Sequence, residues 1–113
     1  MSDVTIYHNP RCSKSRQTLD LLRAKGITPT VVEYLKTPPS PAELRAILDK
    51  LGKEPRAVTR AKEAAEAGIA ADLDGDALVA ALSANPAAIE RPIVVKGDKA
   101  RVGRPPESVL EIL

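Results

Sequence analysis

The sequence has few aromatic residues and a single cysteine. It contains two tyrosines, no phenylalanine and no tryptophan, so we expect an aliphatic core and no site built on stacking against rings. The lone Cys12 excludes an internal disulfide. Together with the one histidine, His8, it falls short of the three or four protein ligands that a zinc site needs, so we expect no metal site.

A strong excess of charge of one sign is also missing. Seventeen Lys and Arg residues against fifteen Asp and Glu residues leave a formal net charge of +2. Domains that bind nucleic acid usually carry a larger positive excess, so nucleic acid is not an expected partner. No apolar run reaches membrane-spanning length, and residues 1–9 lack the basic and apolar regions of a signal peptide. We therefore expect a cytoplasmic monomer that contacts no membrane.

The residues that are present are typical of a globular protein. Apolar residues make up 43% of the 113 residues and charged residues 28%. A chain of this length supports one compact domain with its own core. We predict a single domain over residues 1–113, with a helical insert over about 40–85.

The order of the predicted elements indicates an α/β fold. Strands and helices are expected at residues 4–7 (strand), from Cys12 or Ser13 to Gly26 (helix), 30–35 (strand), 41–51, 56–67 and 76–84 (helices), 93–95 and 100–102 (a hairpin), and after Pro105 (helix). This β-α-β, helical insert, β-β-α order is satisfied by a four-stranded mixed sheet. Its first half would be parallel and its second half antiparallel, as in a thioredoxin-like fold.

Cys12 is the best candidate for chemistry. It follows a predicted strand, lies in a turn and begins a helix, where unpaired N–H groups and the helix dipole stabilise a thiolate. Arg11, Lys14 and Arg16 add positive charge, and His8 could add more or carry a proton. A lone intracellular cysteine can also be an inert buried residue. The polar neighbours of Cys12 favour the reactive interpretation.

Spacing excludes several other sites. A C-x-x-C dithiol would need a second cysteine at position 15 or 9, where the chain has Ser15 and Asn9, so any disulfide of Cys12 must involve another molecule. A Cys-x5-Arg phosphatase loop would need arginine at Thr18. Glycine-rich phosphate loops and the serine-hydrolase elbow are absent as well.

Three arginines are candidates for binding an oxyanion. Arg91 and Arg104 each precede a proline, which holds the backbone extended and directs the side chain, and Arg60 lies in the segment RAVTR at 56–60. Planar guanidinium groups suit a tetrahedral oxyanion. Each arginine alone is also a common solvated surface charge, and spacing does not show that the three converge on Cys12.

These segments together resemble a known family. Residues 7–16 (YHNPRCSKSR) strongly resemble the active-site signature of the glutaredoxin-dependent arsenate reductases of the ArsC type, in particular the short-chain members. The segments YLKTPP at 34–39, TRAKE at 59–63, RPIVV at 91–95 and Arg104-Pro105 also match the family in order. The resemblance extends over essentially the whole chain.

The resemblance implies an activity and its partners. The Cys12 thiolate would attack arsenate, and the adduct would be resolved by glutathione as co-substrate and then by a glutaredoxin, releasing arsenite. No tightly bound cofactor is implied. Because no second cysteine is present, the need for an external thiol agrees with the residues themselves.

The resemblance also implies roles for individual residues and a cis Arg91–Pro92 bond. Cys12 would be the nucleophile, His8 and Ser15 would support it, and the oxyanion would be bound by Arg60, Arg91 and Arg104.

Two other functions are compatible with the scaffold. One is a regulator of the Spx type that binds RNA polymerase, although many of those proteins carry a C-x-x-C switch and this chain has Ser15 at the second position. The other is a general glutathione-linked thiol oxidoreductase, which would reduce mixed disulfides without needing the three arginines.

Overall fold

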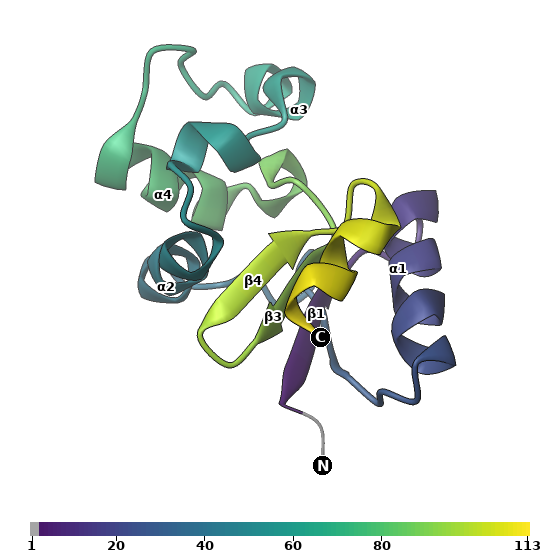
Figure 1. Ribbon diagram of the computed structural model, residues 1–113. Coiled ribbons are helices and arrows are strands. Elements are labelled where there is room, and N and C mark those ends of the chain that lie inside the picture. The colour runs from purple at the N-terminus through teal and green to yellow at the C-terminus, as the bar shows by residue number, and fades with distance from the viewer. Residues whose placement is uncertain (1–2) are drawn as a thin grey trace. The chain divides into compact units, whose positions relative to one another are not determined.

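The structure, a computed structural model, describes residues 3–113 and divides the chain into two compact units. The first is formed by residues 3–37 together with Arg91–Leu113 and is called the sheet unit here; the second, the helical unit, is Pro38–Glu90. In Figure 1 the sheet unit takes the purple, blue and yellow ends of the colour bar, and the helical unit takes the teal and green middle.

The sheet unit contains one four-stranded mixed sheet in the order β2-β1-β3-β4. Its strands are β1 (Val4–His8), β2 (Thr30–Glu33), β3 (Ile93–Lys96) and β4 (Lys99–Val102). β1 pairs parallel with β2 and antiparallel with β3, and β3 pairs antiparallel with β4. The predicted fold class is confirmed.

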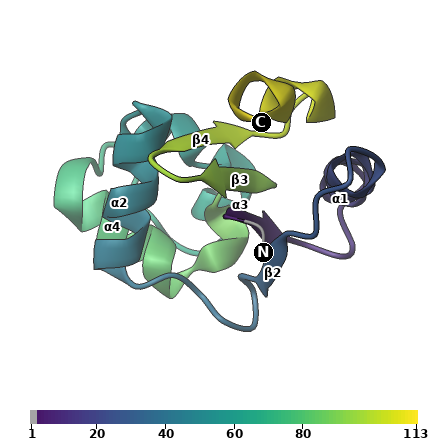
Figure 2. The same ribbon diagram turned by 60° about the horizontal axis from the view of Figure 1, so that its bottom comes forward.

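One face of this sheet is covered by α1 (Ser13–Ala24) and by η3 (Pro106–Ile112), which contact each other (Figure 2). The aliphatic core between these layers consists of Val4, Ile6, Leu19, Leu22, Val94, Val109 and Ile112. In the strands these core residues are two positions apart, and in the helices they are three apart. This spacing places the side chains of each element on one face. The core packs β1 against α1, and Cys12 lies in the turn between these two elements.

The last helix differs from the prediction. It is a 3₁₀-helix, not an α-helix. Val109 and Ile112 are buried while Leu110 is 38% exposed, and this spacing of three matches the three residues per turn of a 3₁₀-helix.

The β3–β4 hairpin turns at Gly97 and Asp98, between the two strands that were predicted to form it. Gly97 has a φ of 60°, and glycine at the first central position is what a type II′ turn demands. The two strands are therefore paired in a register set by this turn.

The helical unit contains α2 (Pro41–Leu51), η1 (Pro55–Val58), α3 (Ala61–Glu66), α4 (Gly75–Ala84) and η2 (Pro86–Ala88). α2 begins with a capping box between Ser40 and Glu43 and ends at Gly52, whose φ is 67°. α2 and α4 contact each other. Both helices bury leucines in the unit.

The helix predicted at 56–67 is broken into η1 and α3. At the break, Thr59 pairs with Ile89 as an isolated β-bridge. The Arg60 N–H donates to the Ala88 carbonyl at 2.7 Å, and the Glu90 N–H donates to the Val58 carbonyl at 2.7 Å. The extended backbone needed for these bonds interrupts the helix.

None of the helices within residues 3–113 combines the length and the apolar character needed to cross a lipid bilayer.

Candidate active site

The turn between β1 and α1 positions Cys12 at the helix N-terminus. The Cys12 N–H donates to the Asn9 carbonyl at 3.0 Å, and the Cys12 carbonyl accepts from the Arg16 N–H at 3.0 Å. Cys12 is the N-cap residue with an extended backbone, and it is partly exposed. The sulfur therefore lies where the unpaired N–H groups of the first turn can reach it.

The surroundings of Cys12 favour its ionised form. Burial opposes ionisation, but the Ser15 N–H, the Arg91 side chain, the Lys14 N–H and the charge of Arg104 outweigh it and lower the pKa of the Cys12 thiol. The first turn of α1 has no acidic residue, so the positive end of the helix dipole is not compensated there. A thiolate is the reactive form of cysteine. The reactive interpretation of Cys12 is thus favoured over the inert one.

Arg91 and Arg104 belong to the C-terminal segment of the sheet unit, and both lie next to Cys12. Arg104 Nη2 donates to Cys12 Sγ at 3.5 Å, and Arg104 Nε donates to the Arg91 carbonyl at 2.7 Å. The Arg91–Pro92 bond is cis, as the resemblance implied, and Arg104–Pro105 is cis too. The Arg91 side chain also hydrogen-bonds to Cys12, so two guanidinium groups lie beside one sulfur.

Gly103 allows this approach. Its N–H donates to the Pro92 carbonyl at 2.9 Å. A Cβ at position 103 would lie 2.6 Å from Thr18 Oγ1 and 2.9 Å from Pro92 Cγ, distances that side chains do not adopt. Only glycine lets the strand end pack this closely on α1, and Arg104 is the next residue.

His8 and Ser15 are brought together, but His8 adds no positive charge. His8 Nδ1 and Ser15 Oγ share a buried hydrogen bond of 2.6 Å, and the Asn9 N–H donates to the same Ser15 oxygen at 3.0 Å. Burial lowers the pKa of His8, Glu33 partly opposes this, and Arg23 adds to it. A neutral ring at pH 7 agrees with a proton carrier or a positioning residue and not with a cation beside the thiol.

Tyr34 is a residue that the sequence reasoning did not select. Its side chain is 2% exposed, and burial raises the pKa of its hydroxyl, against the opposing charge of Arg91 and the side chain of Asn9. Cys12 also acts on it electrostatically. The available signal was its position after β2, since residues that follow the carboxyl ends of parallel strands commonly line sites.

Arg60 lies in the helical unit, at the N-cap of α3. Its Nε donates to Glu63 Oε2 at 3.0 Å and its Nη1 to Glu90 Oε1 at 2.9 Å, and all three side chains are about one-quarter exposed. Burial opposes its charge, but these carboxylates prevail and raise the pKa of Arg60. Its participation beside Cys12 stays a prediction.

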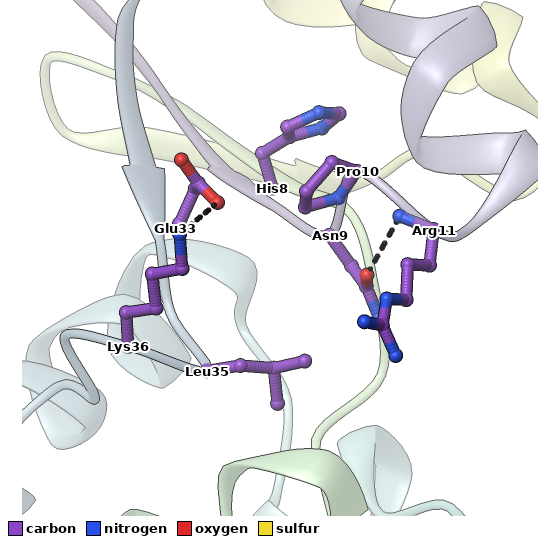
Figure 3. Close-up of a pocket in the computed structure, with 7 residues that line it drawn as sticks. All are labelled: His8, Asn9, Pro10, Arg11, Glu33, Leu35 and Lys36. Carbon is purple, nitrogen blue, oxygen red and sulfur yellow. Dashed lines mark hydrogen bonds and ion pairs between the residues drawn. The ribbon is translucent and has the colours of Figure 1, made fainter.

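A cavity of about 220 Å³ opens at the carboxyl ends of β1 and β2. In Figure 3, Asn9, Pro10 and Arg11 of the turn face residues at and after the end of β2 across an open space. The full lining is His8, Asn9, Pro10, Arg11, Glu33, Leu35 and Lys36. The sequence reasoning missed the contribution of β2, because the pairing of distant strands decides it.

Within residues 3–113, no three side chains of histidine, cysteine, aspartate or glutamate gather in a way that could hold a metal ion.

Comparison with known proteins gives a consistent result. The sequence model of the ArsC family matches residues 7–112. The chain is 53% identical over 114 residues to the uncharacterized protein YfgD of Escherichia coli K12, covering 97% of this chain and 96% of that one. It is 46% identical over 117 residues to an arsenate reductase of Neisseria meningitidis serogroup A, covering all of both chains. A solved arsenate reductase from Vibrio cholerae is 53% identical with a TM-score of 0.91, over 97% of each chain.

Proposed function

The chain belongs to the ArsC family, and from that membership we propose that it is an arsenate reductase in which Cys12 is the nucleophile. The family resemblance read from residues 7–16 is confirmed by the match over residues 7–112. The observation that carries the proposal is the contact of 3.5 Å between Arg104 Nη2 and Cys12 Sγ, at a thiol whose pKa is lowered.

Cys12 performs the first step. Its thiolate attacks the arsenic of arsenate, a sulfur–arsenic bond forms, and an oxygen leaves as water after taking up protons. The lowered pKa of Cys12 keeps a larger share of the sulfur ionised at neutral pH than in a free thiol. Arsenic remains As(V) at this stage.

Arg91 and Arg104 bind the oxyanion. Both act on the sulfur already, so an arsenic bonded to it would place its oxygens within reach of their N–H groups. Donors aimed at oxygens that gain charge in the transition state supply much of the acceleration in such sites. Arg60 is the third oxyanion ligand that we propose.

His8 and Ser15 support the nucleophile without touching substrate. Their mutual hydrogen bond of 2.6 Å and the bond from the Asn9 N–H hold the turn that carries Cys12. The neutral His8 ring can also accept and return a proton through Ser15.

The reductant comes from outside the chain. Reduction of As(V) to As(III) takes two electrons, and the one cysteine of the sequence cannot supply them through an internal disulfide. We expect glutathione to bind the arsenic first and a glutaredoxin to complete the reduction. The two external thiols end as a disulfide, and arsenite leaves. The cytoplasm, where thiols are kept reduced, suits this chemistry.

The test is consumption of NADPH that depends on arsenate, coupled through glutathione, glutaredoxin and glutathione reductase. We expect Cys12→Ser to abolish turnover and Ser13→Ala, a similar change one residue away, to retain it. Turnover that persists in Cys12→Ser would reject the mechanism.

The same protein and its arginine variants can distinguish an arsenate reductase from a general thiol oxidoreductase. That enzyme would reduce glutathione mixed disulfides equally well in Arg91→Ala and in Arg104→Ala, without reducing arsenate. Such a result would replace the present proposal.

A further inference from the structure

The cavity beside the Cys12 turn takes no part in the chemistry described so far. Asn9, Pro10 and Arg11 line it, and Arg11 immediately precedes the nucleophile. The Cys12 N–H is bonded to the carbonyl of Asn9 at 3.0 Å, so the cavity wall and the nucleophile share one turn. The cavity lining therefore includes the residue that directly precedes the nucleophile, whose Cα lies about 3.8 Å from that of Cys12.

Arg11 gives this cavity an available positive charge. Its backbone N–H donates to Asn9 Oδ1 at 3.0 Å, which fixes the turn. Within the described residues 3–113, its exposed guanidinium group makes no hydrogen bond or ion pair. In Figure 3 this group extends beside the open space. An exposed guanidinium at a cavity rim is suited to a carboxylate, which it can bind through two N–H groups.

The rest of the lining adds one cation, one carboxylate and an apolar wall. Lys36 Nζ lies 3.6 Å from Glu33 Oε1, a long and exposed pair that holds neither charge strongly. Burial lowers the pKa of His8, so its ring adds no charge at pH 7. Leu35 is 43% exposed. The lining is thus net positive, with Glu33 placed to meet an ammonium group.

The size of the cavity limits the ligand. Its volume of about 220 Å³ is below the roughly 300–1,000 Å³ of cavities that hold drug-sized ligands. It fits part of a short peptide. An extended tripeptide spans about 10 Å, so one end could lie in the cavity while a central thiol reaches the sulfur of Cys12.

We propose that this cavity binds the carboxylate end of the external thiol co-substrate, a small anionic peptide thiol, with Arg11 as its anchor. The inference rests on the proposed function, because an arsenate reductase with a single cysteine depends on an external thiol. The thiol held there attacks the arsenic on Cys12. A second sulfur–arsenic bond forms, one arsenic–oxygen bond breaks, and the hydroxyl leaves as water with the proton of the thiol, while arsenic stays As(V).

The first experiment measures binding without any arsenic. S-methylglutathione, which has the charges of glutathione but no reactive thiol, is titrated into the ¹⁵N-labelled protein and followed by amide chemical shifts. We expect shifts at Asn9, Arg11, Leu35 and Lys36, and about tenfold or greater weakening in Arg11→Ala, as for a lost charge-assisted hydrogen bond.

Lys25→Ala is the matched control. It removes one exposed positive charge just past the other end of α1, which is 12 residues long. We expect binding of S-methylglutathione to be unchanged. Equal weakening in both variants would reduce the effect to net charge and overturn the proposal, as would shifts confined to other residues.

The second experiment measures turnover with different thiols. In Arg11→Ala we expect the KM for glutathione to rise about tenfold, with the KM for arsenate unchanged, and the rate with uncharged 2-mercaptoethanol to stay as in the unaltered protein. An unchanged KM for glutathione would contradict the site. If S-methylglutathione binds at these residues while arsenate is not reduced, the proposed function fails and the binding site stands.

Discussion

Arg104 and Arg60 are the same residue type in two different electrostatic settings. Arg104, in the sheet unit, is oriented by the carbonyl of Arg91 and donates to the Cys12 sulfur at 3.5 Å. Arg60, in the helical unit, donates to the carboxylates of Glu63 and Glu90 at 3.0 and 2.9 Å.

The hydrogen-bond acceptor of each arginine decides how strongly its positive charge acts on other groups. A carbonyl directs a guanidinium without cancelling its charge, and the charge of Arg104 helps to lower the pKa of Cys12. Two carboxylates direct Arg60 as firmly but offset its charge, and its own pKa rises as a result. We therefore expect Arg104 to be the stronger anion ligand of the two, a difference that the family motif alone does not indicate.

The largest expected effect comes from removing each arginine in turn. Arg104→Ala should lower kcat/KM for arsenate about 100-fold, the usual loss for one oxyanion donor, and raise the pKa of Cys12. Arg60→Ala should cost less, about tenfold, because its charge is already offset. Steady-state kinetics and the pH dependence of Cys12 alkylation provide the measurements. Equal losses in the two variants would contradict the comparison.

A smaller effect is expected from displacing Arg104 through its neighbour. Gly103→Ala brings a methyl group to 2.6 Å from Thr18 Oγ1, and we expect the free energy of unfolding to fall by about 1–3 kcal/mol, as for other overpacked sites. Urea denaturation measures it. The double variant with Thr18→Ala should recover part of the loss, and its failure to do so would exclude this contact as the cause.

Neutralising the carboxylate of Glu90 should leave the charge of Arg60 less offset, as the charge of Arg104 is. In Glu90→Gln the amide can still accept a hydrogen bond from Arg60, but the negative charge is gone. We expect the KM for arsenate to fall about two- to fivefold, the value of a partly exposed ion pair. Lys53→Ala, which changes an exposed charge elsewhere in the helical unit, serves as control. A rise of KM would show that Glu90 positions Arg60 more than it neutralises it.

The smallest effect is expected at His8. Because burial lowers its pKa, the ring carries no charge near pH 7, and His8→Gln should leave the pKa of Cys12 nearly unchanged. Titration of the imidazole by NMR should give a pKa below the ordinary histidine value. The stability that goes with this shift is present above the ordinary value and lost as the pH falls through the lower, folded-state value. A His8 pKa above the ordinary histidine value would contradict this prediction, because the ring would then carry a positive charge near the Cys12 sulfur.

Local features of the fold could be predicted from the sequence. The start of α2 follows from Ser40, Pro41 and Glu43, which lie within one turn of each other. The parallel β1–β2 pair follows from a short strand–helix–strand unit, and the antiparallel β3–β4 pair follows from a hairpin at Gly97. These signals depend on neighbouring residues only.

Features that depend on distant pairs could not be predicted. The break before α3 arises because Thr59 pairs with Ile89, thirty positions further along the chain. The carboxylate of Glu90 at Arg60 and the contribution of Leu35 to the cavity arise in the same way, from tertiary contacts. Within the candidate site, the residue types could be predicted and their partners could not.

The position of Cys12 at the N-cap of α1 affects how the loss of activity in a Cys12→Ser variant is interpreted. Sulfur occupies the place where a serine oxygen would ordinarily cap the first turn. Exchanging it for that oxygen gives the helix an ordinary cap, but it also removes the thiolate that the surrounding N–H groups and arginines stabilise. The melting temperature of a catalytically dead Cys12→Ser protein should therefore be compared with that of the active one, so that the loss of the nucleophile is separated from a change in stability.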